Sequence, residues 1–259
     1  MSAGTKRDRE GNARSAKGRP AVQGGRFQDM FAGFRDELDE HHDRRERIIK
    51  ASRDVTAHSK KIIFTLQRVK QLNKEFPSHI QQDVDKRLQE ISTLLNSISP
   101  DLQSLNRWRY QRQLSCLEEL VEALSFAHYL RHQTLITPAE TQTAVPAEGV
   151  ILSPHDYMYG VFDLSGEMMR FATVTTAQTG ELVGEHGRNI LGDMQALGCA
   201  YEMLPALPTR DFRQKLDVMR QSVRKVEMLG YGLVVRGSER PKGWVPDMKD
   251  DAPEPASPI

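Results

Sequence analysis

The sequence predicts an all-α protein, a single domain of about seven helices. Apolar residues recur every three or four positions over most of the chain, no strand-like alternation of any length is present, and prolines or capping residues separate the periodic segments. The chain has 259 residues, 38% of them hydrophobic, enough for a sizeable core. We assign residues 27–240 to the domain, residues 1–26 to a disordered basic tail and residues 241–259 to a flexible tail.

The first three helices are predicted from the apolar period and its interruptions. The period begins at Phe27, and because no Pro or Gly interrupts residues 34–76, one long helix is expected, with Pro77 as its stop. A second helix is expected over residues 78–98. Ser99-Pro100-Asp101 then ends one helix and begins a third, which should continue to about Leu135.

The later helices are predicted from their caps. Thr137-Pro138-Ala139-Glu140 and Ser153-Pro154 each combine a capping residue with proline at the first helical position, so they begin a short helix and a long one. Residues 180–203 are expected to be helical despite their glycines. Either Thr209 or Asp211 caps a last amphipathic helix.

Composition excludes several functional classes. The formal net charge is +1, so any nucleic-acid surface must come from local clustering rather than from bulk charge. Cys116 and Cys199 offer neither a disulfide framework nor zinc spacing, which predicts a reducing compartment. No apolar run approaches the roughly 20 residues of a membrane span, so no membrane association is expected. The P-loop, the Gly-x-Ser-x-Gly elbow and the dinucleotide fingerprint are also missing from the sequence.

Two segments each place a pair of acids one helical turn apart within an apolar stretch. Glu119 and Glu122 are three positions apart, and Asp163 and Glu167 are four apart, so each pair shares a helix face. Gly160 beside the second pair allows another backbone to approach closely. Clustered carboxylates repel one another unless a cation intervenes, and their oxygens suit Mg²⁺ or Mn²⁺. The sequence therefore predicts that these four acids are metal ligands and catalytic residues, with a metal-activated water attacking phosphorus.

Each pair also has a structural interpretation. Glu119 and Glu122 can be solvated on the outer side of their helix, and Arg170 can neutralise an acid of the second pair. Neither pair has a histidine at the offset that ferritin-like di-iron sites require, which disfavours an iron oxidase. His128 and His132 lack the glutamate of a zinc-protease motif, so we assign them to the core or its edge.

Basic residues are concentrated on the first helix and in the N-terminal tail. A row of them can follow a phosphate backbone, and the candidate RNA-binding residues are Arg44, Arg45, Lys50, Arg53, Lys60 and Lys61. The competing interpretation is a solvated helix face balanced by neighbouring acids such as Asp36 and Glu46. The tail is consistent either with a nuclear-import signal or with an ordinary solvated segment.

Five stretches, in order along the chain, resemble the family of translin-associated factor X within the translin family. They are Glu37-Leu-Asp-Glu-His-His-Asp43, Ser52-Arg-Asp-Val-Thr56, Leu120-Val-Glu-Ala-Leu-Ser-Phe126, Asp163-Leu-Ser-Gly-Glu-Met-Met-Arg170 and Val235-Arg-Gly-Ser-Glu-Arg-Pro-Lys242. The resemblance implies a translin-like bundle of seven helices and hetero-oligomerisation with translin into a closed shell that holds single-stranded RNA. It also implies a location in cytoplasm and nucleus.

The same resemblance implies an activity. In that family the X subunit carries a metal-dependent endoribonuclease centre, which acts in passenger-strand removal during RNA silencing and in trimming transfer-RNA precursors. The family's acidic centre falls on Glu119, Glu122, Asp163 and Glu167. Two alternatives stay open: a non-catalytic partner that stabilises translin and tunes its nucleic-acid binding, and a DNA-binding or trafficking adaptor that depends on the basic tail.

Overall fold

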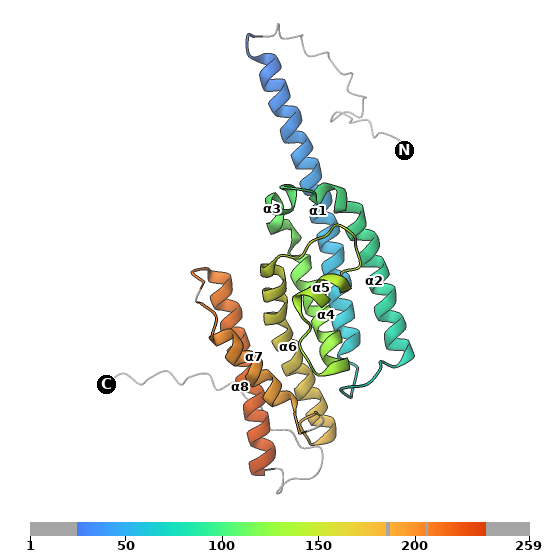
Figure 1. Cartoon of the computed structure of the whole chain (residues 1–259), viewed down its shortest axis with the longest axis vertical. Helices are drawn as coiled ribbons and strands as arrows, with labels where there is room; N and C mark the ends of the chain where they lie inside the picture. The colour runs from blue at the N-terminus through green and yellow to red at the C-terminus, as the bar shows by residue number, and fades with distance from the viewer. Residues whose placement is uncertain (1–24, 185–186, 206, 237–259) are drawn as a thin grey trace, which may run out of the picture. The chain divides into compact units, whose positions relative to one another are not determined.

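The computed structural model describes residues 25–184, 187–205 and 207–236, and most of these residues form helices (Figure 1). No strand occurs among those residues, so the all-α prediction is confirmed. Most of the predicted N-terminal tail and all of the C-terminal tail lie outside them. The elements are α1 (Gln28–Leu66), α2 (Ser78–Ile98), η1 (Ser99–Leu102), α3 (Asn106–Arg109), η2 (Gln111–Leu114), α4 (Cys116–His132), α5 (Pro138–Ala144), α6 (Pro154–Thr179), α7 (Ile190–Glu202) and α8 (Arg210–Arg236), where η denotes a 3-10 helix.

The chain divides into two compact units, residues 1–44 and residues 45–259. The described part of the first unit is the beginning of α1 and the three residues before it. Its apolar side chains Phe27, Phe31, Phe34 and Leu38 are each more than half exposed. This apolar stripe therefore has no core to pack into within the described part of its own unit.

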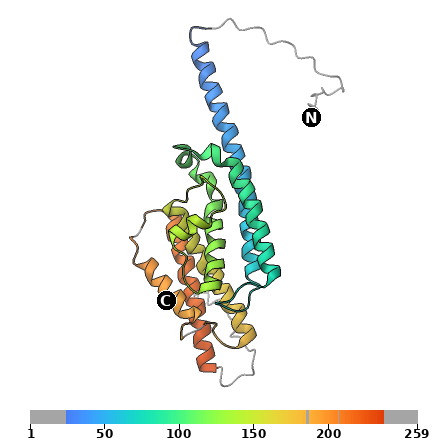
Figure 2. The ribbon, with the colours of Figure 1, turned by 45° about the vertical axis from the view of Figure 1, so that its right-hand side comes forward.

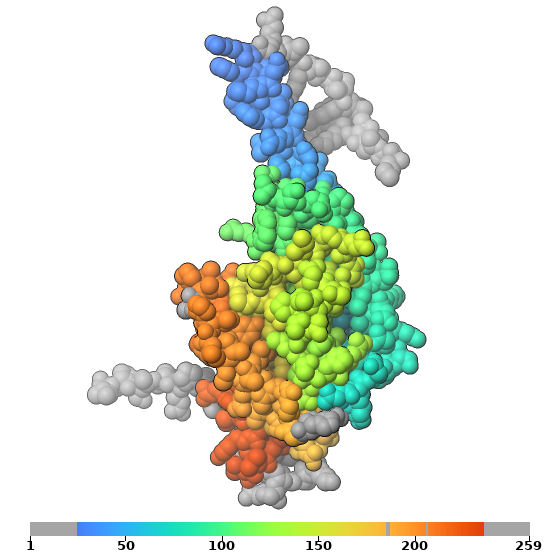
Figure 3. All heavy atoms as spheres, in the orientation of Figure 1, coloured from blue at the N-terminus to red at the C-terminus, as the bar shows by residue number. Residues whose placement is uncertain are grey.

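The second unit is built around α4 and α6. Phe126 of α4 meets Phe171 of α6 edge to face, with ring centroids 6.2 Å apart. Phe162 of α6 meets Phe212 of α8 in the same way at 5.6 Å. Helices α7 and α8 pack on each other and on α6, and the part of α1 in this unit lies with α2 on the other side (Figures 1 and 2). The space-filling view shows α4 and α5 between these two groups (Figure 3).

A glycine allows the two central helices to touch. A Cβ added to Gly160 of α6 would lie 2.6 Å from the carbonyl oxygen of Glu118 and 2.6 Å from Cβ of Val121, both on α4. Real Cβ atoms do not approach other atoms so closely, so only glycine fits at this crossing. The close approach expected at Gly160 is thus confirmed, and it brings the acids of α4 and α6 to the same place.

Three of the predicted helices are wrong in extent, the first of them α1. Helix α1 ends at Leu66 instead of Phe76, and the following loop keeps Val69, Leu72 and Phe76 buried without helical structure. Asn73 in this loop adopts φ 56°, and its backbone N–H donates to the carbonyl oxygen of Leu130 at 2.9 Å. The apolar period therefore continued past the helix because the loop itself packs into the core.

The predicted third helix is broken into η1, α3, η2 and α4. Ser104 has φ 56°, and Arg107 of α3 is buried in an ion pair with Asp156 of α6. That tertiary pair holds a short helix where the sequence predicts a continuous one. The segment 180–203 was also predicted too long, since its helix α7 begins only after Asn189, whose side chain accepts from the N–H of Gly192.

The predicted caps are confirmed. Thr137 and Ser153 each form a reciprocal capping box with the acid three positions later, at the start of α5 and α6. The Thr209 hydroxyl accepts from the N–H of Phe212 at 3.3 Å, so Thr209 rather than Asp211 caps α8. Within the described residues, no helix is long and apolar enough to cross a bilayer.

Candidate acidic active site

Helix α4 carries Glu119 and Glu122 on a face that the rest of the protein covers. Glu122 is 8% exposed, and the side chain of Glu119 is 26% exposed. No described residue forms a hydrogen bond or ion pair with Glu122. The solvated interpretation is therefore wrong for Glu122, which is a buried carboxyl group without a partner of its own.

The environment of Glu122 shows that the four predicted acids lie near one another. The pKa of Glu122 is raised to about 8, mainly by burial and then by the charges of Asp163, Glu119 and Glu167 in that order of size. Lys215 acts in the opposite direction. The crossing of α4 and α6 thus assembles one acidic centre from two segments more than 40 residues apart in sequence.

Lysines neutralise one acid of each pair. Lys60 of α1 places Nζ 3.3 Å from Oε1 of Glu119. Lys215 of α8 places Nζ 2.5 Å from Oδ2 of Asp163. Helices on both sides of the central pair therefore direct an ammonium group into the acidic centre.

Glu167 is held by an amide and an arginine. Gln67, just after α1, donates from Nε2 to Oε2 of Glu167 at 2.6 Å and to its backbone oxygen at 3.0 Å. Arg170 lies one turn further along α6, with Nη1 3.4 Å from Oε2 of Glu167. The arginine partner weighed from the sequence is thus present, and Gln67 fixes the carboxylate from a second element.

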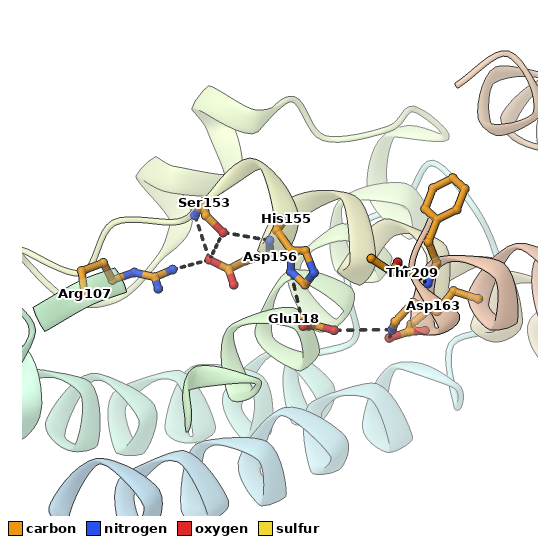
Figure 4. Close-up of polar contacts among 9 residues, drawn as sticks. Arg107, Glu118, Ser153, His155, Asp156, Asp163 and Thr209 are labelled. Atoms are coloured by element: carbon orange, nitrogen blue, oxygen red, sulfur yellow. Dashed lines mark hydrogen bonds and ion pairs between the residues drawn. The ribbon is translucent and has the colours of Figure 1, made fainter. Parts of the chain in front are cut away.

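Sequence reasoning missed Glu118, which also belongs to this environment. Its Oε2 lies 3.5 Å from Nζ of Lys215, and its Oε1 lies 3.7 Å from Nδ1 of His155. The pKa of Glu118 is raised to about 7, mainly by burial, with the charge of Lys215 opposing the rise and that of Asp163 adding to it. Figure 4 shows Glu118 between His155 and Asp163. Glu118 is one turn before Glu122 on α4, a spacing that would have indicated it.

A hard divalent cation fits the chemistry of these groups. The donors are carboxylate oxygens, the ligands that Mg²⁺ and Mn²⁺ take, and buried Glu122 needs a positive partner. The residues that would hold it are Glu119, Glu122, Asp163 and Glu167. Among the described residues, however, no three Asp, Glu, His or Cys side chains are already arranged to hold a metal ion. Side chains must therefore rearrange before such an ion can bind.

The six candidate RNA-binding residues differ in whether an acid already pairs with them. Arg44 lies in the first unit, 2.5 Å from Glu40, and Arg45 is 3.4 Å from its neighbour Glu46. Lys60 is engaged by Glu119, as described above. The remaining three, Lys50, Arg53 and Lys61, are exposed on α1 and have no ion pair within the described part of the chain. Only these last three are directly available to a phosphate backbone.

An all-α bundle with acids at the crossing of two central helices defines the class of this protein. The chain belongs to the translin family, whose pattern matches residues 43–237. It is 31% identical to translin-associated protein X of Mus musculus over 249 residues, covering 84% of this chain and 82% of the relative. It is 28% identical to the translin-associated protein X homolog of Schizosaccharomyces pombe, covering 83% and 91% of the two chains.

Solved structures show the same fold. The chain superposes on the apo-NeC3PO crystal structure with a TM-score of 0.60 and 18% identity, covering 78% of this chain and 96% of that one. The corresponding values for AfC3PO are 0.55, 18%, 80% and 98%. The family resemblance and the translin-like helical fold inferred from the sequence are therefore confirmed.

Proposed function

We propose that this chain is the catalytic subunit of a Mg²⁺-dependent endoribonuclease that works in complex with translin and cleaves single-stranded or nicked RNA. The observation that carries the proposal is the excess of carboxylates at the α4–α6 crossing. Four predicted acids and Glu118 share it with Lys60, Lys215 and Arg170, so the carboxyl groups outnumber the cationic side chains. Mn²⁺ has the same preference for oxygen ligands and should replace Mg²⁺.

The chain's own groups divide the work of cleavage. A bound divalent ion supplies charge stabilisation at the phosphoryl oxygens and a water molecule of lowered pKa. Glu119, Glu122, Asp163 and Glu167 hold that ion, and Gln67 fixes the orientation of Glu167. Lys50, Arg53 and Lys61 lie exposed on α1, where they can bind RNA phosphates.

The proposed partner is translin. The described part of the first unit exposes Phe27, Phe31, Phe34 and Leu38, and apolar patches of this kind mark interaction surfaces. Several relatives of this chain are themselves translins, such as that of Gallus gallus, 23% identical over 214 residues. We propose assembly into a closed shell around the RNA, action in RNA silencing and transfer-RNA processing, and residence in cytoplasm and nucleus.

The test is cleavage of a labelled single-stranded RNA by the chain co-expressed with translin. Asp163→Asn should reduce cleavage by about 100-fold or more. The substitution removes one ligand of the divalent ion, and that ion stabilises the negative charge of the transition state. EDTA should abolish cleavage by the wild type. Asp54→Asn is the matched control, since Asp54 is exposed on α1 and has no ion pair in the described structure. Equal cleavage by the Asp163→Asn complex and the wild type would refute the site.

A second candidate is a non-catalytic subunit that stabilises translin. It is favoured by the contacts that already engage Glu119, Asp163 and Glu167, because such contacts are also typical of structural ion pairs. In that case Asp163→Asn would lower the melting temperature or the yield of complex, and any cleavage would follow the amount assembled. Measuring assembly by light scattering beside cleavage therefore separates the two functions.

A further inference from the structure

Among the described residues, Lys215 is the only lysine whose ammonium group pairs with an acid of α4 and an acid of α6. From α8, its Nζ lies 2.5 Å from Oδ2 of Asp163 and 3.5 Å from Oε2 of Glu118. The same nitrogen is 5.2 Å from the centroid of the Tyr159 ring. The lysine therefore joins a predicted metal ligand to an acid outside the predicted set.

The fold places Lys215 in this position. Phe212, one turn earlier on α8, is 2% exposed and packs edge to face on Phe162 of α6. Met219, one turn later, is 1% exposed. With buried anchors on both sides, the side chain of Lys215 is directed towards α6 and is itself only 21% exposed. A partly buried ion pair of this kind is screened less than a surface pair.

The pair has a direct consequence for cation binding. An oxygen of Asp163 that accepts from an ammonium group at 2.5 Å cannot also coordinate a divalent ion on the same side, and the two positive charges repel. Glu118 offers the ammonium a second carboxylate nearby. The lysine can therefore leave Asp163 and still keep a negative partner.

We propose that Lys215 is the resident counterion of the acidic centre, which holds Asp163 until a divalent cation displaces its ammonium group towards Glu118. The inference rests on the proposed function, because it takes Asp163 as a ligand of that cation. Lys215 is thereby a positioning residue, which keeps the acids together in the cation-free protein. Its presence lowers the affinity for the cation, since binding requires the displacement of a charge.

The first experiment measures Mn²⁺ binding, by electron paramagnetic resonance, to the full chain in complex with translin and without RNA. Lys215→Gln should bind Mn²⁺ about tenfold more tightly or better, because one competing positive charge is gone. Lys225→Gln is the matched control on the same helix, where Lys225 is exposed and has no ion pair in the described chain, and it should bind as the wild type does. Unchanged or weaker binding by Lys215→Gln would overturn the proposal.

A second measurement uses the wild-type complex, so it stands even if Lys215→Gln does not assemble. Brief acetylation followed by mass spectrometry should label Lys215 several times faster with Mn²⁺ than with EDTA, while Lys225 is labelled equally in both. Equal or slower labelling of Lys215 in Mn²⁺ would overturn the proposal.

The two proposals fail in distinguishable ways. If wild type and Lys215→Gln bind Mn²⁺ equally, only the role of Lys215 is refuted. If neither binds Mn²⁺, the metal site and the role of Lys215 fall together. If Lys215→Gln binds more tightly but the complex leaves RNA intact, the counterion role stands and the nuclease function is refuted.

Discussion

Two aspartates seven residues apart on α6 show two opposite ways of handling a negative charge. Asp156 is 2% exposed, and its Oδ2 accepts from the backbone N–H of Ser153 at 2.8 Å, from the Ser153 hydroxyl at 2.7 Å and from the guanidinium of Arg107. Asp163 belongs to a centre in which carboxylates outnumber cationic side chains. Figure 4 shows both groups along the same helix.

The difference indicates which of the two sites is structural. At Asp156 one carboxylate meets one guanidinium and the donors of a capping box, so the charge is satisfied within the chain. At Asp163 the nearby Glu122 remains buried without a partner among the described residues. A fold that buries such a carboxyl group without a partner is expected to bind something at that place.

The largest expected effect on stability comes from breaking the satisfied pair. Asp156→Ala leaves Arg107 buried without a counterion and removes the capping box of α6, which should lower the free energy of unfolding by about 3–5 kcal/mol. Asp163→Ala is the matched substitution on the same helix. It should lower the free energy of unfolding by less than about 1 kcal/mol, since Lys215 still has Glu118 as an ion-pair partner. Urea denaturation of the complex with translin measures both. A similar loss in the two variants would contradict the distinction between the sites.

A smaller effect is expected from the helix crossing that lies between the two aspartates. Gly160→Ala adds a Cβ that would be 2.6 Å from the carbonyl oxygen of Glu118, so α4 and α6 must separate. This separation should lower the free energy of unfolding by about 2 kcal/mol. Gly166→Ala is the control on the same helix, where an added Cβ meets no atom within 4 Å. It should stabilise the protein by about 0.5–1 kcal/mol, because alanine favours a helix. Thermal denaturation that ranks the two variants the other way would show that the crossing is not tight.

The sequence predicts those parts of the site that depend on a single helix. The spacing within each acid pair and the glycine at position 160 are local signals in the sequence. The close crossing of α4 and α6 at Gly160 agrees with them. The caps of α5, α6 and α8 were also local, because a capping residue bonds to its own helix.

What could not be predicted depends on contacts between distant parts of the chain. Lys215 reaches Asp163 across 52 positions, and Arg107 reaches Asp156 across 49. The sequence near Leu66 contains no helix-ending residue, since neither Gly nor Pro occurs between Leu66 and Pro77. Tertiary packing alone ends that helix and breaks the predicted third one.

The remaining expected effect is a pH dependence that belongs to the unsatisfied site. Burial and the neighbouring acids raise the pKa of Glu122 from 4.5 to about 8. A raised pKa means that the folded state binds the proton more tightly than the unfolded state does. This group's contribution to stability is therefore fully present below pH 4.5 and is lost as the pH rises to about 8.

Glu122→Gln removes this dependence because its amide stays neutral. In EDTA the variant should match the wild type near pH 4 and exceed it by a margin that grows as the pH rises to about 8. Glu75→Gln, at an exposed position after α1, is the control and should show no such difference. In Mg²⁺ the advantage of Glu122→Gln should shrink or reverse, since a cation that binds the folded state stabilises the wild type. A gap that stays constant from pH 5 to pH 9 would show that Glu122 is as well satisfied as Asp156.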